Sequence, residues 1–185
     1  MNPETKRSIA CTVITALALL TACDKRPADP SRSGGPAAVS TTPGLPTGLF
    51  LATEPANART VEEVKSAAKT GDKVVVRGRI GGSKAPFVEG RAVFTLMGAG
   101  LDACSDKPGD ECATPWDYCC DTAPDIAKHS VTVQVVDANG APVKAEIRGI
   151  QGLKELSEVV VVGKLTQLDD KATIIAADAM HISKH

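Results

Sequence analysis

GDKVVVRGRI, residues 71–80, shows the clearest strand pattern in this chain of 185 residues. Apolar and polar side chains alternate along it with a period of two, which is typical of a β-strand that buries one face. The residues expected on the buried face are Val74, Val76, Gly78 and Ile80. SEVVVVGKL, residues 157–165, contains four consecutive valines, and so long an apolar run predicts a central strand. Together the two stretches predict a domain built on a β-sheet.

Further apolar stretches predict the remaining strands of this sheet. They cover residues 91–97, 131–135, 142–147 and 172–182. Asn139 and Gly140 form the pair that favours a tight hairpin between the second and third of these stretches. Two short helices are also expected. Thr60 and Glu63 form a capping box at the start of one, and apolar residues at helical spacing within 149–157 predict the other.

The order strand, strand, strand, short helix, strand, strand resembles the OB-fold, a small five-stranded Greek-key barrel. The resemblance covers residues 71–182 and implies a mainly β domain over residues 58–185, with the first short helix ahead of the barrel. The chain departs from the OB pattern in one place. An insert of residues 98–129 lies between the second and third predicted strands, where typical OB domains have a short turn.

Residues 1–22 are predicted to be a bacterial lipoprotein signal peptide. Lys6 and Arg7 precede an apolar run at residues 9–20, which is shorter than the roughly 20 apolar residues that span a bilayer. LTAC, residues 20–23, resembles the lipobox, in which a peptidase cleaves before a cysteine that already bears diacylglycerol. The resemblance implies lipidation of Cys23 and a protein anchored at the periplasmic face of the membrane.

Residues 23–57 are predicted to form a disordered tether between the lipid and the domain. The segment is rich in Pro, Gly, Ser, Thr and Ala, and its spaced prolines prevent a helix or sheet from propagating. In lipoproteins of enteric bacteria, an Asp directly after the lipidated Cys favours retention at the inner membrane. Asp24 occupies that position, so the resemblance implies the inner membrane.

The formal net charge of −1 provides no overall field that would attract nucleic acid or an anionic membrane surface. Such a partner needs a local basic patch, and the candidates are Arg77 and Arg79 on the polar face of the first strand. Acidic side chains of the insert are expected near the same part of the sheet and would repel phosphate. The sequence therefore disfavours nucleic acid as a partner, and it indicates no oligomeric state.

DACSDKPGDECATPWDYCCDTAPD, residues 102–125, holds the cysteines that remain after Cys11 leaves with the signal peptide and Cys23 is lipidated. They are Cys104, Cys112, Cys119 and Cys120. In an oxidising compartment, two structural disulfides are the expected state of four such cysteines. Neighbouring cysteines in extended backbone point apart, so each of the last two is expected to reach a different partner. The favoured pairing is Cys112 with Cys119 and Cys104 with Cys120.

The alternative for the same four cysteines is a thiolate site for Zn or Cu. Their spacing, C-x7-C-x6-C-C, lacks the short knuckles of most zinc sites, so it favours disulfides. His181 and His185 are further candidate ligands for Cu or haem. Secreted OB-type haem chaperones also have a C-terminal His, although His185 stands where their motif has Tyr.

Trp116, Asp117 and Tyr118 are candidate binding residues of the insert. The two aromatic side chains either form an exposed recognition tip or cover the disulfides. The chain has neither a C-x-x-C pair nor a G-x-S-x-G motif, so we do not expect an enzyme.

As a whole, the chain resembles bacterial secreted lipoproteins that share a PWDYCC motif, and this resemblance implies no activity. The expected function is a non-catalytic binding or scaffolding module of the cell envelope, which recognises an envelope protein through its acidic insert. The alternative is an extracytoplasmic protein that handles a metal or haem. Binding of a nucleic acid or another polyanion ranks third.

The lipobox gives the first testable prediction. Cys23→Ala should block lipidation and leave unprocessed precursor, because the peptidase requires the diacylglyceryl cysteine. Globomycin treatment of cells with the unchanged chain should produce the same precursor band on an immunoblot. Normal maturation of the Cys23→Ala chain would exclude lipoprotein processing.

Overall fold

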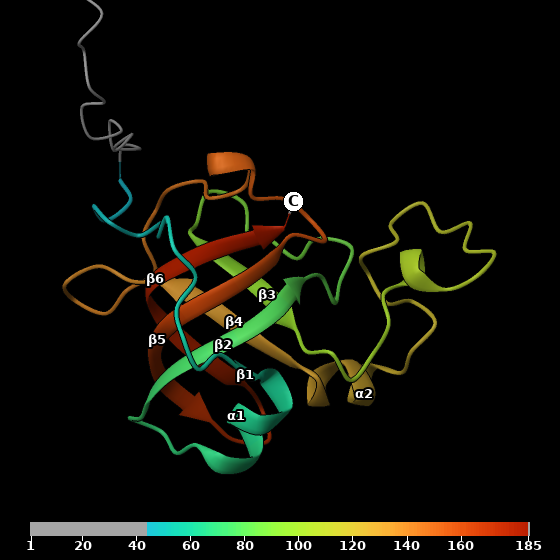
Figure 1. The fold of residues 1–185 in the computed structure, drawn as a ribbon, viewed down its shortest axis with the longest axis horizontal. Helices are drawn as coiled ribbons and strands as arrows, with labels where there is room; N and C mark the ends of the chain where they lie inside the picture. Colours follow the sequence, from blue (N-terminus) through green and yellow to red (C-terminus); the bar gives the residue numbers. More distant parts are fainter. Residues whose placement is uncertain (1–43, 185) are drawn as a thin grey trace, which may run out of the picture. The chain divides into compact units, whose positions relative to one another are not determined.

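Strand β2 (Lys73–Ile80) has the predicted alternation, with Val74, Val76 and Ile80 buried. The computed structural model describes residues 44–184, in which β2 belongs to a six-stranded mixed sheet (Figure 1). The other strands are β1 (Arg59–Thr60), β3 (Val93–Met97), β4 (Ser130–Val135), β5 (Glu158–Leu168) and β6 (Thr173–Lys184). The predicted signal peptide, Cys23 and His185 lie outside the described residues, as does the first part of the predicted tether.

The pairing of the strands places β2 next to three others. Strand β1 is parallel to β2, whereas β3 and β5 are both antiparallel to it. Strand β4 pairs with β3 on one side and lies parallel to β6 on the other. Strand β6 pairs with β5, so the order of pairing returns to β2. The prediction of a mainly β domain is confirmed.

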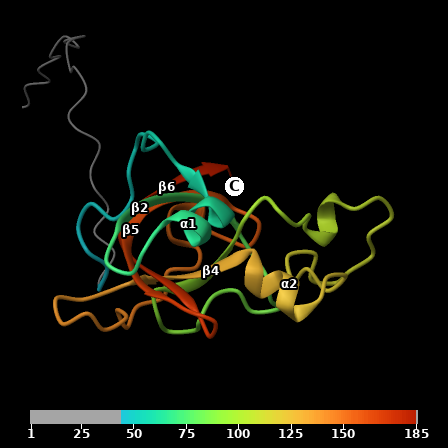
Figure 2. The ribbon, with the colours of Figure 1, turned by 90° about the horizontal axis from the view of Figure 1, so that it is seen from below.

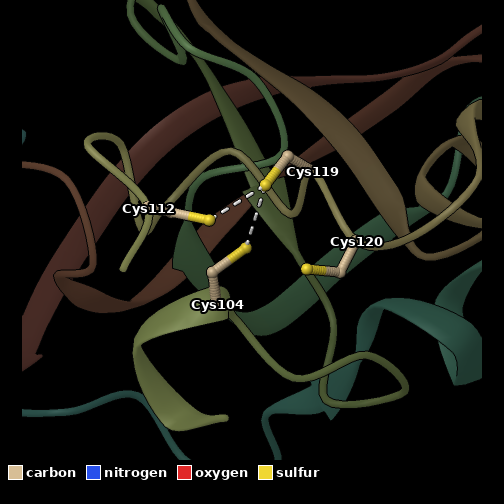
Figure 3. Close-up of side chains that lie close together, drawn as sticks. All are labelled: Cys104, Cys112, Cys119 and Cys120. Carbon is tan, nitrogen blue, oxygen red and sulfur yellow. Dashed lines mark hydrogen bonds between the residues drawn. The ribbon is translucent and has the colours of Figure 1, made fainter. Parts of the chain in front are cut away.

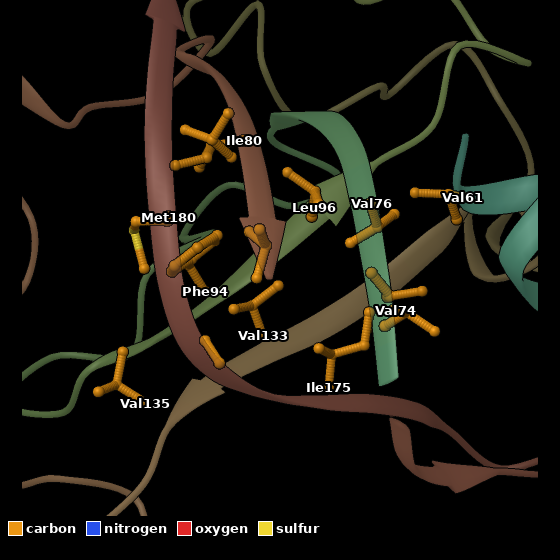
Figure 4. Packing of buried hydrophobic residues seen from close by; sticks show 14 of the residues in the cluster. Val61, Val74, Val76, Ile80, Phe94, Leu96, Val133, Val135, Ile175 and Met180 are labelled. Carbon is orange, nitrogen blue, oxygen red and sulfur yellow. The ribbon is translucent and has the colours of Figure 1, made fainter. Parts of the chain in front are cut away.

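One hydrophobic core fills the space enclosed by these strands. Figure 4 shows side chains from β2, β3, β4 and β6 pointing toward one another in this core. Those labelled on the sheet strands are Val74, Val76, Ile80, Phe94, Leu96, Val133, Val135, Ile175 and Met180. Burial of this apolar surface is the main favourable contribution to folding.

Helix α1 (Val61–Ala67) covers one end of the core with Val61 and Val64. The predicted capping box is present: the Thr60 hydroxyl accepts a hydrogen bond from the Glu63 N–H, and the Glu63 carboxylate accepts one from the Thr60 N–H. Ahead of this helix, Leu49 is buried and Phe50 forms a bridge with Met180 of β6. Docked residues therefore precede the domain start expected at residue 58.

The prediction of a hairpin strand at residues 142–147 is wrong, because the structure has no strand there. The turn itself forms, because the Asp137 carboxylate accepts hydrogen bonds from the Asn139 and Ala141 N–H groups. Beyond it only one bridge forms, between Val136 and Pro142, and proline cannot donate to a ladder. Strand β4 pairs with β6 instead. At residues 149–157, the predicted short helix is a 3-10 turn at Ile150–Gly152.

Helix α2 (Ala123–Lys128) is the only other α-helix of residues 44–184. No helix within this described range is long and apolar enough to span a bilayer.

Leu165 of β5 provides a test of the core. Its side chain is fully buried, so Leu165→Ala should lower the free energy of unfolding by about 2–5 kcal/mol. The neighbouring Lys164 is exposed, and Lys164→Ala should change it by less than about 0.5 kcal/mol. Denaturant unfolding followed by circular dichroism measures the free energy of unfolding of both variants. Equal decreases would contradict the assignment of Leu165 to the buried face and Lys164 to the exposed face of β5.

Candidate metal centre

The insert, residues 98–129, leaves the sheet after β3 and returns to it at β4. Figures 1 and 2 both show it projecting from one side of the sheet, with α2 at its return. A 3-10 turn at Cys104–Asp106 and α2 are its only helical segments. Its small apolar cluster consists of Met97, Ala103 and Tyr118 with Leu101, Ile126 and Leu156 packed against them. Polar contacts must therefore supply much of its order.

The two ends of the insert are held together at its neck. The Gly98 N–H donates to the His129 carbonyl over 2.7 Å. The Glu62 carboxylate of α1 accepts from the Gly100 N–H over 3.1 Å and lies 2.8 Å from His129 Nδ1. Partial burial acts to raise the pKa of Glu62, but the contact with His129 and the backbone hydrogen bonds outweigh it and lower this pKa. The sequence patterns did not indicate this anchor, because its members come from distant segments.

The PWDYCC turn of the insert docks against the end of β2. The Gly82 N–H donates to the Trp116 carbonyl over 2.9 Å, and Trp116 Nε1 donates to the Lys84 carbonyl over 3.2 Å. Gly81 has no room for a side chain, since a Cβ there would lie 2.7 Å from the Trp116 carbonyl oxygen and 2.9 Å from the Tyr118 ring. Tyr118 is buried with φ of +57°, and burial raises its pKa to about 12. Of the two aromatics, Tyr118 therefore packs inward, while Trp116 stays half-buried.

The sulfur atoms of Cys104, Cys112, Cys119 and Cys120 all lie within 4.8 Å of one another. Figure 3 shows them turned toward a common centre. Cys119 Sγ is 3.2 Å from Cys112 Sγ and 3.6 Å from Cys104 Sγ. Tetrahedral coordination with Zn–S bonds of about 2.3 Å places sulfur atoms about 3.8 Å apart. The four thiols therefore lie close enough together to hold one tetrahedral metal ion after shifts of less than about 1 Å.

The four cysteines are free thiols in the structure, and no disulfide joins them. The favoured pairing of Cys112 with Cys119 and of Cys104 with Cys120 is therefore not the state observed. One sulfur, that of Cys119, contacts both Cys112 and Cys104, so the contacts do not divide into two separate pairs.

Asp117 holds the cysteine turn in shape. Its buried carboxylate accepts hydrogen bonds from the Cys119 N–H over 3.0 Å and from the Thr114 hydroxyl over 2.6 Å, and it lies 3.9 Å from Cys104 Sγ. The Thr114 hydrogen bond holds the pKa of Asp117 below its usual value. A second loop contact pairs Lys107 with Asp121 over 3.0 Å. Outer contacts of this kind orient metal ligands.

Nearby carboxylates favour the protonated form of Cys112 and Cys119 when no cation is bound. Burial acts to raise the pKa of Cys104, but hydrogen bonds from Cys119 and the backbone outweigh it and lower this pKa. Asp110 raises the pKa of Cys112 well above its ordinary value. Contact with Cys112 acts to lower the pKa of Cys119, but Cys104 and Asp117 outweigh it and raise this pKa to about 11. A metal ion reverses this preference because it stabilises thiolates, so binding would release protons.

The remaining candidate residues lie in other surroundings. Arg77 pairs with Glu54, and Arg79 pairs with Asp106 of the insert and with Glu158. The His181 ring lies on β6 and contacts the Leu51 carbonyl, so it does not join the cysteine group. The predicted basic patch is thus neutralised by carboxylates among the described residues.

Two hollows border the insert. One, of about 280 Å³, lies between β2 and the insert and is lined by Arg79, Asp102 and Tyr118 among others. The other is an open groove of about 820 Å³ beside Trp116, with Phe87 and Leu153 in its wall.

Comparison with known proteins finds no family model that matches this chain and no curated protein with significant similarity to its sequence.

Gly81 tests the docking of the cysteine turn. Gly81→Ala should displace the Trp116 carbonyl and the Tyr118 ring, because the added methyl group would overlap both. The single Trp of the chain reports this as a change in fluorescence, together with faster hydrogen exchange within residues 98–129. The exposed neighbour Ser83 supplies the control, Ser83→Ala, which should leave both unchanged. An unaltered Gly81→Ala spectrum would contradict the close packing described.

Proposed function

We propose that this chain is a lipid-anchored protein of the cell envelope that binds one soft metal ion, Zn²⁺ or Cu⁺, through Cys104, Cys112, Cys119 and Cys120. The observation that supports it is the convergence of four sulfur atoms within 4.8 Å of one another. Thiolates are the ligands that these soft ions prefer. The spacing C-x7-C-x6-C-C lacks the short knuckles of most zinc sites, so spacing alone gave this set only as an alternative to disulfides.

The surroundings of the thiols favour a centre that accepts and releases its ion over a purely structural one. Cys104 is buried, whereas Cys112 is half-buried and Cys119 and Cys120 are exposed. An incoming ligand therefore has access to three of the four sulfurs. Residues 102–125 also hold seven acidic side chains against one lysine, and this negative field would draw cations to the insert.

The fold and location belong to the same proposal. We interpret the longer strands as an OB-like barrel, and the pairing of β5 with both β6 and β2 supports this interpretation. The lipobox and the proline-rich segment after it support a protein tethered to the membrane, with the metal centre on the periplasmic side. The role is binding and handover of an ion, without catalysis.

The second candidate function is a binding or scaffolding module for an envelope protein. The groove of about 820 Å³ beside Trp116 favours it, since half-buried aromatic side chains at the rim of a groove are common in binding surfaces. In this case the metal ion would shape the surface and the partner would contact the groove.

Metal analysis tests the proposal directly. The mature lipoprotein, extracted in detergent under reducing conditions, should bind one Zn²⁺ or Cu⁺ per chain and release protons as it does so. Binding of Co²⁺ should produce the absorption bands of tetrahedral thiolate coordination. Cys104→Ser should shift and weaken these bands, because one of the four thiolates is lost, while Ser105→Ala at the exposed neighbouring position should leave them unchanged. A reduced chain that binds none of these ions would exclude the metal centre and favour the second candidate.

Asp117 offers a milder test of the same centre. Asp117→Asn keeps the size of the side chain but removes the charge that orients the Cys119 N–H and the Thr114 hydroxyl. Loss of such an outer contact lowers metal affinity by about 10–100-fold. Competition with a chelator of known affinity measures the change, and unaltered affinity would contradict the orienting role.

A further inference from the structure

We propose that oxidation opens the metal centre at one edge of the cysteine cluster, the pair Cys112 and Cys119. A disulfide between these two residues forms first and releases the ion. This inference rests on the proposed metal-binding function and adds how the ion leaves. Its basis is the unequal geometry and exposure of the four sulfurs.

The Cys112–Cys119 edge is the shorter of the two hydrogen-bonded sulfur contacts in the cluster, at 3.2 Å. From the spacing in the structure, closing it into a disulfide requires the sulfurs to approach by about 1.2 Å, given an S–S bond of about 2.05 Å. From the spacing of about 3.8 Å around a bound tetrahedral ion, the approach is about 1.8 Å. The loop between the two residues contains Pro115 and the turn in which the Asp117 N–H donates to the Thr114 carbonyl. This turn already holds the two cysteines face to face.

Two of the competing pairs are disfavoured for separate reasons. Cys104 is 3.6 Å from Cys119, but it is fully buried and therefore shielded from an external oxidant. Cys119 and Cys120 are adjacent in the chain, and a bond between them would strain the peptide that joins them. Cys119 is exposed and contacts both Cys112 and Cys104, so it can be reached by an oxidant and has a neighbouring thiolate in place to complete the bond.

The oxidant is a disulfide of a thiol carrier in the envelope. This disulfide accepts both electrons, so the oxidation state of the metal ion does not change. The Cys119 thiolate attacks one sulfur of that disulfide, forming a mixed disulfide and expelling one carrier thiolate. The Cys112 thiolate then attacks Cys119 Sγ and expels the second carrier thiolate. Two cysteine thiolates lose two electrons in total, and the carrier disulfide gains them. The ion keeps its charge and is left with Cys104 and Cys120, which are too few ligands for tight binding.

Oxidised glutathione serves as the probe for the experiment. The zinc-loaded, detergent-extracted lipoprotein is treated with it in the presence of a chromogenic chelator, and thiols are counted in parallel. We expect one Zn²⁺ released for each disulfide formed, and recovery of binding after reduction. Release only after two disulfides, or disulfide formation without release, would overturn the inference.

Peptide mapping identifies the bond. Cleavage before Asp and after Glu separates the cysteines into residues 102–105, 112–116 and 117–120. The first cross-link should join 112–116 to 117–120. In Cys120→Ser the same cross-link should form. Peptide 117–120 then contains Cys119 as its only cysteine, so the bond must join Cys112 to Cys119. A first cross-link that involves 102–105 would contradict the proposed order.

Cys112→Ser removes the proposed edge and should greatly slow zinc release relative to Cys120→Ser, which has the same number of thiols. Circular dichroism of both variants confirms that the sheet is intact. Equal release rates in the two variants would also overturn the inference. A protein that holds no zinc before oxidation would instead exclude the proposed function, so the two failures are distinguishable.

Discussion

The structure depends on the two hydrogen-bonding edges of β2. One edge pairs with β5 along most of the strand, while the other pairs with β1 near its middle and with β3 at its end. Its inward side chains meet the core, and Gly81 and Gly82, directly after it, meet the cysteine turn. The same strand that organises the sheet therefore also positions the cysteine cluster.

The insert shows how a segment with little apolar surface becomes ordered. Its apolar cluster is small, so hydrophobic burial contributes much less there than in the sheet. Its polar contacts include the hydrogen bonds of Asp117, the pairing of Arg79 with Asp106, and the neck at Glu62. Asp110 raises the pKa of Cys112, and Asp117 contributes to the raised pKa of Cys119, so carboxylates of the insert oppose a negative charge on these two thiols.

The regular parts of the fold were predictable because their causes are local. Alternation at residues 71–80 predicted β2, and Thr60 with Glu63 predicted the start of α1. The strand expected at 142–147 failed because Pro142 cannot extend a ladder and the other edge of β4 is taken by β6. The convergence of the cysteines was not predictable from spacing. It depends on the positive φ of Tyr118 and on the missing side chain of Gly81, and the second of these lies far away in sequence.

The neck of the insert also bears on how such a protein can change. Gly98 and His129 are joined by a backbone hydrogen bond, and Glu62 contacts both Gly100 and His129, so the ends of the loop are fixed independently of its contents. Once the ends of a loop are fixed, lengthening it costs little further free energy, since closure entropy grows only slowly with length. Residues between 101 and 128 can therefore vary in number without opening the neck, but Trp116, Tyr118 and Asp106 also contact the end of β2, so a replacement needs counterparts of these contacts. A loop moved to another protein needs a counterpart of Glu62 as well, because that carboxylate lies on α1 and outside the insert.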